Sequence, residues 1–172
     1  MKRSEIINKP EYFNRYINLL PDVELLEALY QSGQPLFESE ASKLNGLQDK
    51  VYAPNKWTVK DIIQHIIDCE RIFAYRALRF AREDKTPLPG FEENDYAKSA
   101  HILDRSLDEL LQELYILRES NILMFKGFSN EQLMREGPSN NYTTQVLAFG
   151  FTIAGHGLHH LAIIKERYYP LI

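Results

Sequence analysis

The chain has 172 residues, 44% of them hydrophobic, and a formal net charge of −4. We expect this length to form one globular domain, residues 1–172, because it supports one real core and is short for two. Basic residues are scattered among acidic ones, which argues against a surface that binds nucleic acid or an anionic membrane.

The single cysteine, Cys69, excludes an internal disulfide and favours a reducing compartment. The N-terminal sequence lacks the apolar core of a signal peptide, and no run approaches the ~20 apolar residues of a membrane-spanning helix. We therefore expect a cytoplasmic protein without a membrane partner. Apolar residues recur at helical spacing nearly throughout, which predicts an all-α chain.

The first predicted element is a short helix at Pro10–Leu20, whose aromatic residues should pack the segment 1–21 onto the end of a helical bundle. A longer helix should follow, with Asp22 as its N-cap. Gly33 and Pro35 interrupt this second helix. Because the apolar phase resumes beyond them, we expect one kinked helix here rather than two separate helices.

The next helix is predicted to begin after Thr58, which has an acidic residue three positions later, and to run to about Arg82. Glu70 falls in the middle of its apolar arc, where a bare carboxylate would be costly. We expect Arg118, on the following long helix, to pair with it. A structural ion pair is favoured over a catalytic role, because ion-pair networks often resemble functional sites.

A long polar connection over Glu83–Asp104 follows, and structureless loops of this length are often functional. A serine N-cap at Ser106 predicts the third long helix, which Gly127 should end. Ser129 begins one more short helical turn, and Gly137–Tyr142 is predicted to be a loop that leads into the last helix.

The last helix, predicted within Thr143–Tyr168, carries three of the five histidines. Positions four apart project side by side, so His156 and His160 can share one metal ion. Both lie on an otherwise apolar stripe that should face inward. His159 is rotated by about 100° from His160, and its stripe is typical of a surface, so we leave it out of the ligand set.

His65 lies at the edge of the apolar arc of its own helix and can face into the bundle, where metal sites are built from facing helices. Taken alone, it fits a half-buried, hydrogen-bonded imidazole. Two further histidines in an apolar stripe would each need a partner if no metal were present, so a shared ion is simpler. We predict that His65, His156 and His160 bind one divalent transition metal, with Zn or Ni favoured and Fe or Mn as alternatives.

Several residues near these histidines have two interpretations. Cys69, one turn beyond His65, could supply a thiolate, although a free cysteine is more often a small buried hydrophobic residue. Three glycines in the last helix indicate either tight helix packing or close approach of a ligand. They are Gly150, Gly155 and Gly157.

Metal-binding histidines usually donate their second ring proton to a carboxylate, a carbonyl or water. Asp61, Asp68 and Asp95 are the acids most plausibly within reach. We prefer Asp95, which lies in the long polar connection, as the candidate catalytic or supporting acid.

Three segments of the chain together resemble the DinB-like superfamily, also called DinB/YfiT-like: Lys56–His65, Asp68–Phe80 and Ala154–Tyr168. The similarity extends from about Tyr16 to Tyr168. It implies a four-helix bundle with long crossover connections, often dimeric, that holds a divalent metal by three histidines. Carried over to this chain, those ligands are His65, His156 and His160.

Characterised branches of this family include enzymes that use a low-molecular-weight thiol and a proposed metal-dependent hydrolase. The resemblance therefore implies a metal-dependent thiol S-transferase or hydrolase that acts on a small cytoplasmic molecule, in a homodimer. The alternative is a non-catalytic, metal-stabilised bundle that serves as a binding module. Gly157 departs from the family, where a larger residue such as glutamate is common, and this departure should remove a supporting acid and widen the pocket.

Overall fold

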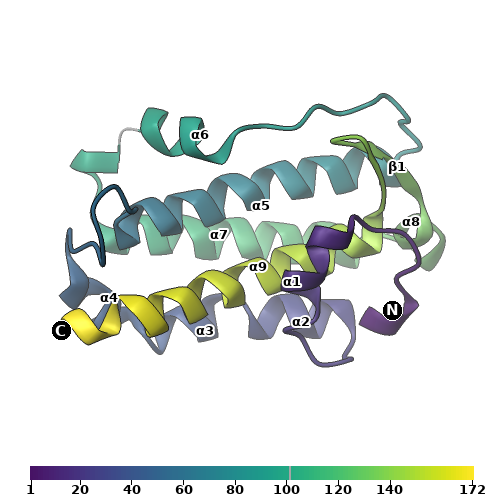
Figure 1. Ribbon diagram of the computed structural model, residues 1–172. Coiled ribbons are helices and arrows are strands. Elements are labelled where there is room, and N and C mark those ends of the chain that lie inside the picture. Colours follow the sequence, from purple (N-terminus) through teal and green to yellow (C-terminus); the bar gives the residue numbers. More distant parts are fainter. Residues whose placement is uncertain (101) are drawn as a thin grey trace.

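The computed structural model describes residues 1–100 and 102–172 and is mainly helical, as the apolar spacing predicted (Figure 1). Its long helices are α5 (Val59–Ala81), α7 (Leu107–Lys126) and α9 (Val146–Arg167). The shorter helices are α1 (Asn14–Ile17), α2 (Leu25–Gln31), α3 (Gln34–Glu38), α4 (Ala41–Leu47), α6 (Glu93–Ser99) and α8 (Asn130–Met134). Four 3₁₀ turns, Arg3–Glu5, Glu11–Phe13, Ile102–Asp104 and Tyr169–Leu171, and two strands, β1 (Glu136–Ser139) and β2 (Tyr142–Gln145), complete the described elements.

The helices form a four-helix bundle in which α2, α3 and α4 together replace one long helix. Figure 1 shows these three helices one after another along the bundle, while the connection between α5 and α7 runs back over its whole length. Because of this crossover, α5 and α7 point the same way. The most extensive helix contact joins α5 to α9, and α1 also packs on α9. The predicted bundle with a long crossover is thus confirmed.

The predicted starts of α5 and α7 are confirmed because both are set by local capping. Thr58 Oγ1 accepts a hydrogen bond from the Asp61 backbone N–H at 3.2 Å, and the Asp61 carboxylate accepts one from the Thr58 N–H at 2.8 Å. Ser106 and Glu109 make the same reciprocal pair at the start of α7. Each exchange satisfies two backbone N–H groups that a helix start leaves unpaired.

The prediction of one kinked second helix is wrong, and so is that of its cap. The chain breaks twice, around Gly33 and again before Ala41, into α2, α3 and α4. Gly33 has a non-helical ψ of −132°, and a Cβ atom there would lie 2.9 Å from Cγ of Arg118. Asp22 does not cap α2, because its carboxylate accepts hydrogen bonds from the backbone N–H and hydroxyl of Ser4.

Two segments predicted as loops contain regular structure. The connection Glu83–Asp104 includes helix α6, and the segment predicted as a loop before α9 belongs to an antiparallel hairpin in which Ser139 pairs with Tyr142. Asn140 and Asn141 have φ angles of 48° and 65°, as a two-residue hairpin turn of type I′ requires. Leu88 of the crossover exchanges backbone hydrogen bonds with this hairpin at 3.0 Å.

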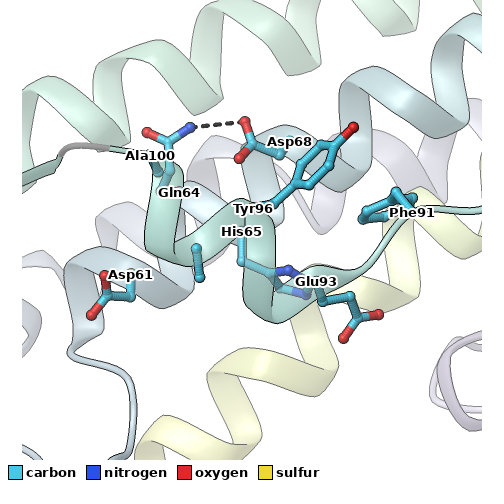
Figure 2. Close-up of a pocket in the computed structure, with 9 residues that line it drawn as sticks. Asp61, Gln64, His65, Asp68, Phe91, Glu93, Tyr96 and Ala100 are labelled. Carbon is cyan, nitrogen blue, oxygen red and sulfur yellow. Dashed lines mark hydrogen bonds between the residues drawn. The ribbon is translucent and has the colours of Figure 1, made fainter.

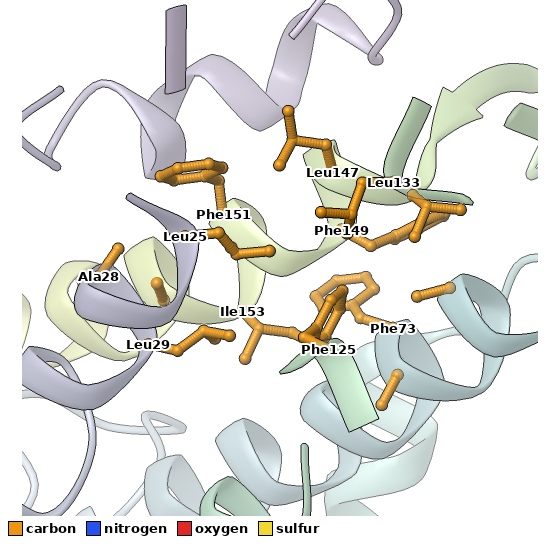
Figure 3. Close-up of a cluster of buried hydrophobic side chains, with 14 of the residues drawn as sticks. Leu25, Ala28, Leu29, Phe73, Phe125, Leu133, Leu147, Phe149, Phe151 and Ile153 are labelled. Atoms are coloured by element: carbon orange, nitrogen blue, oxygen red, sulfur yellow. The ribbon is translucent and has the colours of Figure 1, made fainter. Parts of the chain in front are cut away.

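The buried apolar residues form two clusters along the bundle. Figure 3 shows one of them, in which Phe73, Phe125 and Phe149 from α5, α7 and α9 converge with Leu25 and Leu29 of α2. The other cluster includes Ile63, Leu110, Leu114, Leu161 and Ile164. On α9, His156 and His160 lie between the residues of the first cluster, which end at Ala154, and those of the second, which begin at Leu161. His65 of α5 packs against both histidines, so a polar layer crosses the core.

The expectation that no run approaches a membrane-spanning helix is wrong by length and composition. The segment Val146–Leu171, which includes α9, is long and apolar enough to cross a membrane, and its most apolar window has a mean hydropathy of 1.4. However, 72% of its most apolar window is buried inside the bundle. Such burial is what the central helix of a helical bundle requires, so its composition is explained by packing.

The predicted ion pair between Glu70 and Arg118 is confirmed in the same polar layer. Nε and Nη2 of Arg118 each donate to one oxygen of the Glu70 carboxylate at 2.8 Å. The remaining guanidinium protons go to the Leu29 carbonyl, the Ser32 hydroxyl and the Ile153 carbonyl. Because these partners lie on or next to α2, α5 and α9, one side chain of α7 connects all four sides of the bundle.

Candidate metal centre

Helices α5 and α9 bring His65, His156 and His160 together in the polar layer. The ring centroids lie 5.0 Å apart for His65 and His156, 4.8 Å for His65 and His160, and 4.5 Å for His156 and His160. His65 comes from α5, and the other two occupy adjacent turns of α9. The convergence of these three residues is the arrangement that the sequence predicted for a metal site.

The two histidines of α9 point the same ring nitrogen at each other, with 3.0 Å between the two Nε2 atoms. Two imidazole nitrogens bound to one ion at 2.0–2.1 Å are separated by roughly 2.9–3.4 Å for bond angles between 90° and tetrahedral. The observed separation falls in this interval, so the pair fits one shared ion.

All three imidazoles are kept neutral by burial. His65 and His156 are only 6% and 3% exposed. Burial lowers the pKa of His65 to about 4. Burial, followed by the neighbouring His65 and His159, lowers the pKa of His160 to about 3. The pKa of His156 is lowered well below its usual value by burial and then by His160 and His65. Neutral imidazole is the form that binds a metal.

Cys69 also belongs to this cluster. Its Sγ atom lies 3.6 Å from Nδ1 of His65, and ligand atoms of His65, Cys69 and His156 all lie within 4.8 Å of one another, as a metal ion requires. Burial raises the pKa of the thiol. In the absence of a metal, Cys69 is therefore a protonated, buried side chain, and both interpretations made from the sequence fit its position.

Aromatic rings surround the histidines. Trp57 lies 4.9 Å from His65, between ring centroids, and Tyr16 packs edge to face on His156 at 5.0 Å. Tyr16 comes this close because α1 lies directly on Gly155, where a Cβ atom would be 2.2 Å from the Tyr16 carbonyl oxygen. The glycine therefore serves close packing, and the packing orients an aromatic wall of the site.

The other two glycines of α9 also serve packing. A Cβ atom on Gly150 would lie 2.7 Å from Leu25, and one on Gly157 would lie 3.3 Å from the Phe37 ring. The expectation that Gly157 widens the pocket is wrong, because its missing side chain would contact Phe37 of α3, which lines none of the cavities beside the histidines.

His159, which we left out of the ligand set, is half-buried on another side of α9. Its ring packs edge to face on Tyr16, with 5.2 Å between centroids. Burial and then the nearby Arg15 cation lower its pKa.

Two cavities open beside the cluster. One, of about 260 Å³, is lined by His160, Trp57 and residues of the loop before α5. The other, of about 120 Å³, reaches His156 and Cys69 and is also lined by Arg76 and Glu93. In Figure 2, α6 passes in front of His65. Phe91, Glu93 and Tyr96 leave a space of only about 10 Å³ beside this histidine. The crossover segment thus covers His65 and forms one wall of the cavity at His156.

The predicted acids lie in different places. Asp61 caps α5, and Asp68 accepts a hydrogen bond from Gln64 at 2.9 Å in the hollow beside His65 (Figure 2). The Asp95 carboxylate is 72% exposed, lies 3.9 Å from the Lys98 ammonium and lines a surface hollow without histidines.

The acid that the sequence analysis missed is Glu93, two residues before Asp95. It lines both the hollow at His65 and the cavity at His156. Burial and then the neighbouring Glu92 raise the pKa of its carboxyl. Glu93 was missed because the segment was predicted as a loop. In helix α6, residues two positions apart lie on roughly opposite faces, so Glu93 and Asp95 point in different directions.

Comparisons with known proteins agree on the family. The chain is 30% identical over 121 residues, 68% of either chain, to a protein of Halalkalibacterium halodurans named "Putative metal-dependent hydrolase BH0277". Its fold is similar to that of YfiT from Bacillus subtilis, described as a probable metal-dependent hydrolase with an unusual four-helix bundle topology. The TM-score is 0.69 and the identity 17%, over 97% of this chain and 91% of YfiT. The model of the DinB superfamily matches residues 10–164, and the chain therefore belongs to the DinB superfamily.

Proposed function

We propose that the protein is a metal-dependent enzyme in which His65, His156 and His160 bind one divalent transition metal, with zinc or nickel favoured. The observation that carries this proposal is the pair of facing Nε2 atoms of His156 and His160, 3.0 Å apart, with a third imidazole beside them. The relative of Halalkalibacterium halodurans, named as a metal-dependent hydrolase, supports it.

A divalent ion held by three neutral imidazoles keeps its full charge and supplies Lewis-acid chemistry, which can lower the pKa of a water molecule or a thiol. The chain supplies the surroundings. Tyr16, Trp57 and Phe73 place rings against the histidines and limit the access of water. Glu93 adds a carboxylate at the cavity, where it can take a proton from the nucleophile.

The reaction class is the second part of the proposal: hydrolysis, or transfer of an external thiol to a small electrophile. Hydrolysis is supported by the names of the relatives, and thiol transfer by the family resemblance. Among the described residues of the site, Cys69 is a poor nucleophile, because it is buried and burial raises the pKa of its thiol. Water or a thiol from solution would be the nucleophile.

The test is to remove metal from untagged protein, reload it with Zn, Ni, Mn or Fe, and assay two reactions in parallel. One is the hydrolysis of small esters and amides, and the other is conjugation of a generic electrophile with several low-molecular-weight thiols. We expect one reloaded form to exceed the metal-free protein in one of these reactions. Equal rates with and without metal across the whole set would contradict the proposed function.

Replacing Glu93 with glutamine is expected to lower kcat by about a hundredfold to ten-thousandfold, the usual contribution of a general base. The metal content should not change, because Glu93 is not one of the ligands. Asp95→Asn is the matched control: it changes an acid of the same helix whose carboxylate is 72% exposed, and it should leave kcat near the wild-type value. A greater loss in Asp95→Asn than in Glu93→Gln would restore Asp95 as the acid.

The competing function is that of a non-catalytic, metal-stabilised bundle that binds a partner. A site sealed by side chains would favour it, whereas the described residues form cavities of about 120 and 260 Å³ beside His156 and His160. We therefore favour the enzyme. A homodimer in the cytoplasm, with a small molecule as the partner and no nucleic acid, remains part of this proposal.

A further inference from the structure

Arg76 is a buried cation that lines the same cavity as His156. It lies on α5, two turns after Cys69, and is only 5% exposed. Its Nη2 atom donates to the Pro89 carbonyl at 2.7 Å, and its guanidinium lies 5.9 Å from the centre of the Phe91 ring. Within residues 1–100 and 102–172 we find no carboxylate in ion-pair contact with it and no other hydrogen bond from it.

Arg118 shows how this fold treats a buried guanidinium that has only a structural role. It makes five hydrogen bonds, two of them to the Glu70 carboxylate. Arg76 is buried to a similar degree and has one neutral partner. The free donors of Arg76 are not among the fully enclosed atoms without a partner, so they reach the cavity that Arg76 lines. Because a largely buried charge is costly unless it is paired, these donors are placed to bind a negative partner there.

The cavity next to Arg76 is suited to hold that partner. Its walls include Tyr12, Tyr16, Phe73 and Phe91, and Arg76 and His156 both line it. Its volume is about 120 Å³, somewhat less than the cavity of about 150 Å³ that holds a benzene molecule, but it is partly open to solvent. It can therefore enclose a small anionic group and part of a ring, while the rest of the molecule lies in the opening. On α5 the rise from Cys69 to Arg76 is about 10 Å, so a molecule of this size can extend from the guanidinium toward the histidines.

We propose that Arg76 binds the anionic group, a carboxylate or a phosphonate-like oxyanion, of a small substrate whose apolar body lies among these aromatic rings. This inference rests on the proposed function, because it assigns the substrate class of that site. The planar guanidinium suits an oxyanion, to which it can donate two parallel hydrogen bonds. Glu93 lines the same cavity without pairing with Arg76, which leaves the guanidinium free for the ligand.

The test is direct binding, measured by calorimetry on the metal-loaded protein, with benzoate and phenylphosphonate as anionic probes and benzamide as the neutral probe. We expect at least one anion to bind about tenfold more tightly than benzamide, or more, because hydrogen bonds to a charged group are the stronger ones. Arg76→Met should remove this preference and leave benzamide binding unchanged. Arg79→Gln, which takes a cation from the same helix outside the cavity, should change neither affinity.

Two further measurements distinguish the loss of the anion site from the loss of the metal and from misfolding. His156→Ala should keep the preference for the anion, so that loss of the metal and loss of the anion site are distinguishable. Arg76→Met should melt no lower than the wild type, because methionine replaces an unpaired buried cation with an apolar side chain of similar length.

The inference is overturned if wild-type protein binds benzamide as tightly as the anions, a result that needs no variant. It is also overturned if Arg76→Met keeps the anion preference. If His156→Ala then loses that preference, the anion binds at the metal.

Discussion

Replacing His156 with alanine is expected to lower the kcat of the metal-loaded protein by on the order of a thousandfold or more, because the ion supplies several kcal/mol of transition-state stabilisation. His156 is the most buried of the three histidines, and its Nε2 atom faces that of His160. Without His156, only two of the three imidazoles remain, that of His65 on α5 and that of His160 on α9. The measurement is steady-state turnover in whichever hydrolysis or thiol conjugation the reloaded wild type performs.

His159→Ala is the matched control for this experiment. His159 lies next to His160 in the sequence, but its ring packs on Tyr16, and we leave it out of the ligand set. We expect its replacement to change kcat by less than tenfold. If His159→Ala lost as much activity as His156→Ala, the ligand set would be wrong. If neither variant lost activity, the reaction would not depend on this cluster.

Replacing Arg118 with alanine is expected to lower the free energy of unfolding by about 3–5 kcal/mol, the usual cost of leaving one buried charge without its partner. Both side chains of the pair are 2% exposed. The change would leave the Glu70 carboxylate with Asn121, at 3.1 Å, as its remaining described partner. The Leu29 and Ile153 carbonyl oxygens would also lose the hydrogen bonds that they accept from Arg118. Urea unfolding of the metal-free protein would measure the loss.

A double replacement separates the charge from the packing. Glu70→Leu combined with Arg118→Met removes both charges and keeps most of the volume, and it should recover much of the loss, because well-packed apolar residues often replace a buried ion pair without a net cost. A cost below about 1 kcal/mol for Arg118→Ala alone would place this pair among solvated surface ion pairs and contradict its buried role.

The sequence predicted those parts of the fold that depend on local contacts. Thr58 and Ser106 begin α5 and α7 because a capping box involves residues only three positions apart. Similarly, the four-residue spacing of His156 and His160 determines their common face on any straight helix. The pairing of Glu70 with Arg118 could be predicted because burying an unpaired carboxylate in an apolar arc costs free energy, so this carboxylate needs a cation.

Other features depend on contacts between distant segments and were therefore missed. At Gly33 the chain leaves the helical conformation, and a Cβ atom there would lie 2.9 Å from Cγ of Arg118, 85 positions later in the chain. Glu93 and Arg76 meet at one cavity only because the crossover runs back over α5. The hairpin turn at Asn140 and Asn141 was missed for a different reason. The two asparagines are a local turn signal, but the short strands on either side lack the alternation of apolar residues that predicts a hairpin.

The central claim is that three histidines hold one metal ion, and the most direct test is the metal content of untagged protein measured by elemental analysis. Wild type and the alanine variants of His65, His156, His160 and His159 would be expressed, purified and reloaded in parallel. We predict about one divalent ion per chain in the wild type and in His159→Ala, and a large loss in each of the other three variants. Equal metal content in the wild type and His156→Ala would contradict the account.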